Sequence, residues 1–199
     1  MSAGTPDDYF AFMGIDHELL IDTRMLEQRY FQLSRDFHPD FHTDASEEAR
    51  QASLDNSSML NRAYRTLKDP YERARHLLAL ESRDVSEAQR RQIPPSLLME
   101  VMEMQETIAE ARHGGRDADP ERAEALRGIH ERLQTRLNNL RGDLDLLAHE
   151  WNAVAQERER AHKEPILNRL NELLDTRNYL RTMLQTVEAA LHGAPAPRH

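Results

Sequence analysis

The chain has 199 residues, of which 31% are charged and 6% are aromatic, and its formal net charge is −9. This acidity disfavours general binding to nucleic acids, and the lack of cysteine excludes disulfides and thiolate metal sites. No apolar run approaches the roughly 20 residues that span a bilayer, and the first residues lack the pattern of a signal peptide, so we expect a soluble cytoplasmic protein that binds no membrane.

The composition of the whole chain predicts an all-helical protein, because leucine, alanine, glutamate and arginine are abundant and strand-forming residues are few. We expect one helical turn over residues 9–13 and a longer helix from Asp22 or Thr23 to Phe37. Its apolar stripe recurs every three or four residues, at Leu26, Tyr30, Leu33 and Phe37. The opposite side is basic or neutral and carries Arg24, Gln28, Gln32 and Arg35. Two interpretations of that side stay open: an ordinary solvated face, or a docking surface for an acidic partner.

A His-Pro-Asp tripeptide at residues 38–40 ends this helix. Proline lacks the backbone N–H and pushes the preceding residue out of helical geometry, so we expect His38 and Asp40 to be displayed on a loop. Ser46 can cap a second helix that extends to Leu67. Its stripe consists largely of small side chains that let another helix approach closely: Ala49, Ser53, Asn56, Leu60, Ala63 and Leu67. Together the two segments predict an antiparallel helical hairpin with the loop at its tip.

A shorter helix follows the hairpin. Asp69 provides its N-cap, Pro70 occupies its first position, and its apolar pattern ends near Glu81. Pro94 and Pro95 cannot continue a helix, and we place the domain boundary there.

The remainder of the chain predicts three helices packed roughly antiparallel. The first covers residues 96–112, and the second begins at Pro120 and carries one apolar seam over many turns. Pro165 is expected to force a stop or a kink before the last helix.

The helix over residues 96–112 has two apolar faces. One is suited to a core and contains Leu97, Val101, Met104, Ile108 and Ala111. The other contains Leu98, Met99 and Met102, beside Glu103 and Glu106. A helix that is apolar on two sides is either sandwiched between other helices or presents a surface to a partner, and methionine is common on such surfaces. The pattern alone leaves both interpretations open.

The sequence contains 10 histidines but no motif for catalysis or metal binding. His38 and His42 have the spacing of a helical metal pair, but Pro39 breaks the helix that would align them. Neither an HExxH motif nor a glycine-rich phosphate loop occurs. We therefore expect no metal, no cofactor and no enzymatic activity.

The basic-faced helix, the His-Pro-Asp tripeptide and the partner helix resemble the J domain of DnaJ-type co-chaperones. The closer resemblance is to the HscB co-chaperone family, which serves iron–sulfur cluster assembly. It is carried by residues 8–10, 29–33, 61–70, 73–78 and 98–100. The chain lacks the Gly/Phe-rich segment and the CxxC repeats of general DnaJ proteins. It departs from the family in Phe41, where lysine is frequent, and in a longer stretch between Trp151 and Tyr179.

The resemblance implies an all-α protein with a J domain, made of an antiparallel helical hairpin plus short helices, over residues 1–82. A linker over 83–95 would join it to a C-terminal three-helix bundle over 96–192 that binds a scaffold protein. Residues 193–199 would form a disordered tail.

The resemblance also implies two partners for a monomeric co-chaperone. The first is a DnaK-type, HscA-like chaperone, whose ATPase would be stimulated by His38, Pro39 and Asp40 and by the docking face of Arg24, Gln28, Arg29, Gln32 and Arg35. The second is an IscU-like iron–sulfur scaffold, delivered to the chaperone and bound through Leu98, Met99, Met102, Glu103, Glu106 and Tyr179. With this resemblance, the second face of the 96–112 helix is interpreted as a binding surface.

A different class of function fits the same helical pattern. In this alternative the chain is a helical or coiled-coil adaptor with no chaperone role, and the tripeptide only ends a helix. Substitution of His38 and Asp40 would then change no activity. An enzyme is the weakest of the three hypotheses.

Overall fold

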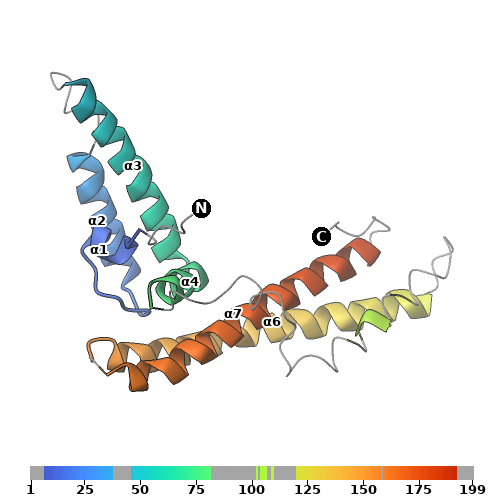
Figure 1. Cartoon of the computed structure of the whole chain (residues 1–199). Coiled ribbons are helices and arrows are strands. Elements are labelled where there is room, and N and C mark those ends of the chain that lie inside the picture. Colours follow the sequence, from blue (N-terminus) through green and yellow to red (C-terminus); the bar gives the residue numbers. More distant parts are fainter. Residues whose placement is uncertain are drawn as a thin grey trace, which may run out of the picture. The chain divides into compact units, whose positions relative to one another are not determined.

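The computed structural model describes residues 7–37, 46–81, 102, 104–106, 109, 120–157 and 159–191. All regular secondary structure in these ranges is helical, and the predicted all-α class is confirmed (Figure 1). The helices are α1 (Tyr9–Met13), α2 (Thr23–Asp36), α3 (Glu47–Lys68), α4 (Pro70–Glu81), α6 (Pro120–Val154) and α7 (Arg160–Leu191). None of these helices is both long and apolar enough to cross a membrane.

The chain divides into two compact units. The N-terminal unit contains Met1–Asp84 and also Leu146–Leu170, whereas the C-terminal unit contains Val85–Asp145 and Asn171–His199. Helices α6 and α7 therefore contribute to both units. The expected linker at 83–95 and tail at 193–199 lie outside the described residues.

Side chains that satisfy free backbone N–H groups set the helix starts in the N-terminal unit. The Asp22 carboxylate accepts a hydrogen bond from Arg24 N at 2.8 Å and caps α2. The Asp69 carboxylate accepts from the backbone N–H groups of Tyr71 and Glu72, at 2.8 and 3.0 Å, and Pro70 opens α4. Both predicted N-caps are confirmed, as are the ends of these helices near Phe37 and Glu81.

Helices α2 and α3 form the predicted antiparallel pair (Figure 1). The α3 stripe is buried at Ser53, Leu60, Ala63 and Leu67. Tyr30 of α2 was expected on the apolar stripe, but it is half-buried and takes a polar role. Its hydroxyl donates to Asn61 Oδ1 at 2.9 Å, and its ring stacks on Tyr64 with centroids 4.4 Å apart.

Helix α1 packs against α2 and α3 and buries Phe10 and Met13 completely. It ends at Gly14, whose φ of 65° is in the left-handed region that favours glycine. Arg29 of α2 donates from Nε to the Met13 carbonyl at 3.0 Å, next to that turn. This hydrogen bond fixes the end of α1 on the side of α2.

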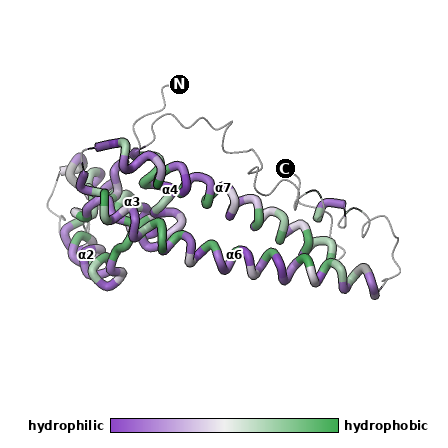
Figure 2. Tube along the Cα trace, turned by 90° about the horizontal axis from the view of Figure 1, so that it is seen from below, coloured by the Kyte–Doolittle hydropathy of each residue, from purple (hydrophilic) through white to green (hydrophobic). Residues whose placement is uncertain are grey.

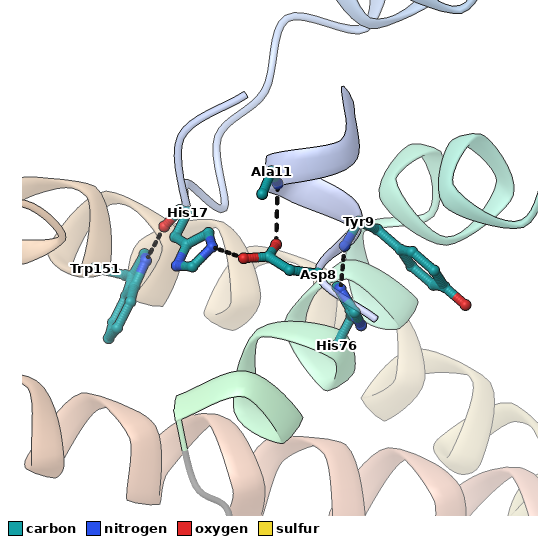
Figure 3. Close-up of polar contacts among 6 residues, drawn as sticks. All are labelled: Asp8, Tyr9, Ala11, His17, His76 and Trp151. Carbon is teal, nitrogen blue, oxygen red and sulfur yellow. Dashed lines mark hydrogen bonds and ion pairs between the residues drawn. The ribbon is translucent and has the colours of Figure 1, made fainter. Parts of the chain in front are cut away.

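The tip of the α6–α7 hairpin packs inside the N-terminal unit. Trp151 is 0% exposed, and its Nε1 donates to the His17 carbonyl at 2.7 Å (Figure 3). Asn152 Oδ1 accepts from the backbone N–H groups of Leu19 and Leu20, at 2.8 and 3.3 Å. Both residues lie within the range 96–192 that the sequence analysis gave to the C-terminal bundle, and the sequence pattern contained no sign of these contacts.

A polar cluster beside this tip joins α1, the following loop and α4 (Figure 3). His17 Nε2 lies 2.9 Å from Asp8 Oδ2, and Asp8 Oδ1 accepts from Ala11 N at 3.0 Å, which caps α1. Burial alone would raise the pKa of Asp8, but these two hydrogen bonds and the charges of His17 and His76 lower it. His76 is buried, and its Nε2 accepts a hydrogen bond from Tyr9 N at 3.1 Å. Nε2 therefore carries no proton, and the imidazole is neutral.

Helices α6 and α7 are amphipathic, and Figure 2 shows hydrophobic and hydrophilic residues alternating along both. In the C-terminal unit their buried side chains include Leu126, Ile129, Leu133, Leu140, Leu144, Leu173, Leu180, Met183 and Val187. The α6 start at Pro120 is confirmed. A stop or a kink was expected at Pro165 before the last helix. The stop is wrong, because α7 begins at Arg160 and continues through this proline. Pro165 lies in the second turn, where its missing N–H removes a single helical hydrogen bond.

We expect Gly14→Ala to lower the free energy of unfolding by about 1–2 kcal/mol, because a side chain at positive φ is strained. The new Cβ would also lie 3.0 Å from the guanidinium of Arg29. Gly128→Ala is the matched control: Gly128 lies in the exposed part of α6 with nothing within 4 Å of the new Cβ, and the change should stabilise by about 0.5–1 kcal/mol. Urea unfolding measures both, and a Gly14→Ala variant as stable as wild type would contradict the role of this turn.

We expect the protein to lose stability as the pH falls below 6.5, in part through His76. Burial lowers the pKa of His76 below its ordinary value of 6.5. The negative charge of Asp8 opposes this by raising the pKa, and His17 adds a smaller lowering effect. The folded state then binds fewer protons than the unfolded state, so protonation of His76 favours unfolding. The contribution of neutral His76 to the free energy of unfolding is therefore complete above pH 6.5 and is lost at lower pH. Its slope reaches at most about 1.4 kcal/mol per pH unit. Urea unfolding from pH 8 to 5 should show a steeper loss for wild type than for His76→Gln, and parallel curves would contradict the assignment.

Candidate functional site

The outer face of α2 is exposed, as the sequence predicted. Arg24, Gln28, Gln32 and Arg35 are all accessible to solvent. Two large apolar side chains are exposed on the same helix: Met25 is 67% exposed and Phe31 is 56% exposed. The helix therefore offers positive charge together with apolar area, a combination that suits a protein partner more than a small ion. Met25 was not identified from the sequence.

Arg29 differs from the other residues expected on this docking face. It is half-buried, and besides the bond to the Met13 carbonyl its Nη1 donates to Gln32 Oε1 at 3.0 Å. Both bonds hold the guanidinium along the protein surface. The structure thus assigns Arg29 a role in fixing α1 and orienting Gln32, whatever contact it also makes with a partner.

His38, Pro39 and Asp40 lie outside the described residues, which resume at Ser46. The structure does define the residue that leads into them. The Phe37 ring contacts Phe12, with centroids 5.8 Å apart, and the Phe37 N–H donates to the Leu33 carbonyl at 2.9 Å. The Phe37 carbonyl accepts two hydrogen bonds, from Ser53 Oγ at 2.6 Å and Ser57 Oγ at 3.0 Å.

The sequence analysis identified Ser53 as a small side chain on the α3 stripe but did not identify its hydroxyl as a hydrogen-bond donor. Ser57 was not singled out. Two serines spaced i, i+4 on the helix that pairs with α2 are the signal that could have revealed them, because such residues lie on one face and hydrogen-bond readily to backbone groups.

The second predicted surface belongs to the C-terminal unit and is described at a few positions only. Met102, Met104, Gln105, Glu106 and Ala109 are helical. Met102 is 61% exposed and Glu106 is exposed, whereas Met104 is 5% exposed. These positions agree with the two-faced helix expected from the sequence. Leu98, Met99 and Glu103 lie outside the described residues.

Tyr179 of α7 lies beside this helical segment. Its hydroxyl accepts a hydrogen bond from Gln105 Nε2 at 3.4 Å, which brings the two helices together next to Met104 and Glu106. Burial raises the pKa of Tyr179, and the weaker opposing effect of the Gln105 bond does not cancel it. The phenol is therefore neutral at physiological pH and can offer a partner both a donor and an apolar ring.

Across the described ranges, no three histidine, aspartate or glutamate side chains are grouped so that they could hold a metal ion. The two surfaces consist of exposed arginine, glutamine, glutamate and methionine on helices. Their arrangement is suited to contacts with other proteins.

Two solved structures share this fold. Human co-chaperone protein HscB aligns with a TM-score of 0.59 and 23% identity, over 94% of this chain and 84% of the human chain. Chaperone HscB from Vibrio cholerae aligns with a TM-score of 0.56 and 24% identity, over 87% of this chain and 96% of that chain. The fold class, with its N-terminal J domain and helical C-terminal domain, is thus that of HscB structures.

Sequence comparisons agree with the structural ones. The family model described as the HSCB C-terminal oligomerisation domain matches residues 93–162. The co-chaperone protein HscB homolog of Shewanella pealeana is 31% identical over 140 residues, which are 70% of this chain and 78% of that protein. The homolog of Neisseria meningitidis serogroup B is 41% identical over 106 residues, which are 53% of this chain and 64% of that protein. This chain belongs to the HscB co-chaperone family.

Proposed function

We propose that this chain is a cytoplasmic, non-enzymatic co-chaperone that stimulates the ATPase of a DnaK-type, HscA-like chaperone. It delivers an IscU-like iron–sulfur scaffold to that chaperone and so aids cluster maturation and transfer. Membership of the HscB family supports this proposal. The observation that carries it is the exposed, arginine-bearing face of α2, whose C-cap, Phe37, directly precedes His38.

The α2 face provides the chaperone contact in this proposal. The protein has a net charge of −9, so exposed arginines on one helix stand out against an acidic background. Such a local positive surface raises the association rate with an acidic partner and favours one orientation of docking. Arg24, Gln28, Gln32 and Arg35 make the electrostatic contact, and Met25 and Phe31 supply apolar area beside it. His38, Pro39 and Asp40 then engage the ATPase domain.

The surface around Met102 provides the scaffold contact. An exposed methionine can adapt its shape to a partner, and Glu106 lies one turn further along the same helix. The Gln105–Tyr179 hydrogen bond holds this helix to α7, and Met104 on the same helix is buried. The proposed scaffold contact also includes Leu98, Met99, Glu103 and Tyr179.

The two surfaces act by tethering. A protein that holds a client and a chaperone at once turns their encounter into an intramolecular step, so each experiences a raised effective concentration of the other. Hydrolysis of ATP takes place in the chaperone, and this chain supplies no reacting group. Stimulation by the chain and the scaffold together should therefore exceed the sum of their separate effects.

The adaptor hypothesis remains the second candidate, favoured by the long α6–α7 hairpin and by the description of the matching family model as an oligomerisation domain. It predicts no stimulation of a competent chaperone. It also predicts self-association of the full chain in analytical ultracentrifugation at micromolar concentration. The co-chaperone proposal predicts a monomer.

We expect His38→Gln to abolish stimulation of the chaperone ATPase and its synergy with the scaffold, because the side chain belongs to the proposed chaperone contact. The measurement is steady-state ATPase of the HscA-like chaperone, with this protein and the scaffold added separately and together. His149→Gln makes the same chemical change at an exposed position of α6 and should behave as wild type. Undiminished stimulation by His38→Gln would refute the proposed contact.

We expect Met102→Ala to weaken scaffold binding by roughly 5- to 30-fold, the usual effect of removing an interface anchor, with a change in stability under about 0.5 kcal/mol. Isothermal titration calorimetry measures the first quantity and urea unfolding the second. Met104→Ala removes the same side chain from the core two residues away and should cost about 2–5 kcal/mol of stability. Scaffold affinity that Met102→Ala leaves unchanged would remove this residue from the proposed surface.

A further inference from the structure

The Phe37 carbonyl is held more firmly than the end of a helix requires. Phe37 is the C-cap of α2, and carbonyl groups in the last turn of a helix have no intrahelical partner. Water or one side chain usually satisfies such a group. Here Ser53 and Ser57 both donate to the same oxygen, at 2.6 and 3.0 Å.

The geometry of α3 explains how two donors reach one acceptor. Ser53 and Ser57 are four residues apart, so their side chains lie one above the other on the face turned toward α2. A carbonyl oxygen has two lone pairs and accommodates both hydroxyls. Ser53 is 5% exposed, and this bond is therefore shielded from competition with water.

We propose that Ser53 and Ser57 are positioning residues for the chaperone-contact tripeptide, an inference that rests on the proposed function. The Phe37 carbonyl belongs to the peptide group that joins Phe37 to His38. Because a peptide group is planar, orienting its oxygen also orients the bond by which the chain leaves α2. The two serines thereby fix the direction in which the chain continues to His38.

The Phe37 ring and N–H reinforce this arrangement. The ring contacts Phe12 of α1, and the N–H donates to the Leu33 carbonyl within α2. The side chain, the donor and the acceptor of this one residue are thus held by three different helices. Loss of the serine bonds releases only the peptide group toward His38, since the other two contacts remain.

A loose peptide group would weaken chaperone binding without removing any group that touches the chaperone. The apparent dissociation constant rises in proportion as the binding-competent fraction falls. Two hydrogen bonds of ordinary strength correspond to roughly a tenfold change in that fraction. The concentration of this protein that gives half-maximal stimulation should rise, while the maximal ATPase rate stays close to that of wild type.

The test compares the Ser53→Ala, Ser57→Ala double variant with wild type in the chaperone ATPase titration. We expect a five- to tenfold higher half-maximal concentration. Ser58→Ala is the matched control, because Ser58 is exposed on the same helix and undergoes the same chemical change. Ser57→Thr, which keeps a hydroxyl, should stay within twofold of wild type. Loss of the two bonds outweighs the better helix propensity of alanine, so the melting temperature of the double variant should fall below that of Ser58→Ala, and the titration is run at a temperature where both variants are folded.

A purely structural role gives a different pattern, namely a lower melting temperature with an unchanged half-maximal concentration at a temperature where the variant is folded. That result would overturn the inference. NMR provides a readout that does not depend on the chaperone: the Phe37 carbonyl ¹³C and His38 amide ¹⁵N shifts should move in the double variant and not in Ser58→Ala. If wild type fails to stimulate the chaperone ATPase, the proposed function is refuted. The NMR shifts then test separately whether the two serines orient the Phe37 peptide group, and unchanged shifts in the double variant would refute that.

Discussion

The N-terminal unit depends on hydrogen bonds that residues far along the chain make to the backbone of the loop between α1 and α2. This loop has no regular structure, so its backbone groups need partners from elsewhere. Trp151 and Asn152 provide them by bonding to the His17 carbonyl and to the N–H groups of Leu19 and Leu20. Two residues after Leu20 comes Asp22, the cap of α2. The position at which α2 begins is thus set by the tip of the α6–α7 hairpin.

Helix α2 is fixed along its inner side, and this leaves its outer side to a partner. Arg29 contacts the end of α1, Tyr30 contacts α3, and Phe37 contacts both helices. A helix restrained at its start, middle and end loses little further conformational entropy when another protein binds to it. This kind of preorganisation favours the role proposed for this chain, in which it acts through contacts with other proteins.

Sequence reasoning succeeded where the signal is local and failed where it is distant. The caps at Asp22 and Asp69 act within three residues, and the α3 stripe follows helical periodicity, so both were predictable. The bond from Trp151 to His17 spans 134 residues and has no sequence signature. Pro165 was misjudged because its cost depends on its distance from the helix start, which periodicity does not define. Both surfaces were located from helical periodicity, whereas their interpretation as binding surfaces came from the resemblance. The serine contacts with Phe37 required coordinates.

The N-terminal unit is built from two separate segments of the chain, Met1–Asp84 and Leu146–Leu170, and this has a consequence for biosynthesis. During translation at roughly 5–20 residues per second, the first segment leaves the ribosome several seconds before the second. Throughout that interval the loop that carries His17 and Leu19 lacks its partners, and the apolar surface that later covers Trp151 is open. The nascent chain then exposes apolar area that the second segment later buries, the condition under which incompletely folded chains are prone to aggregate.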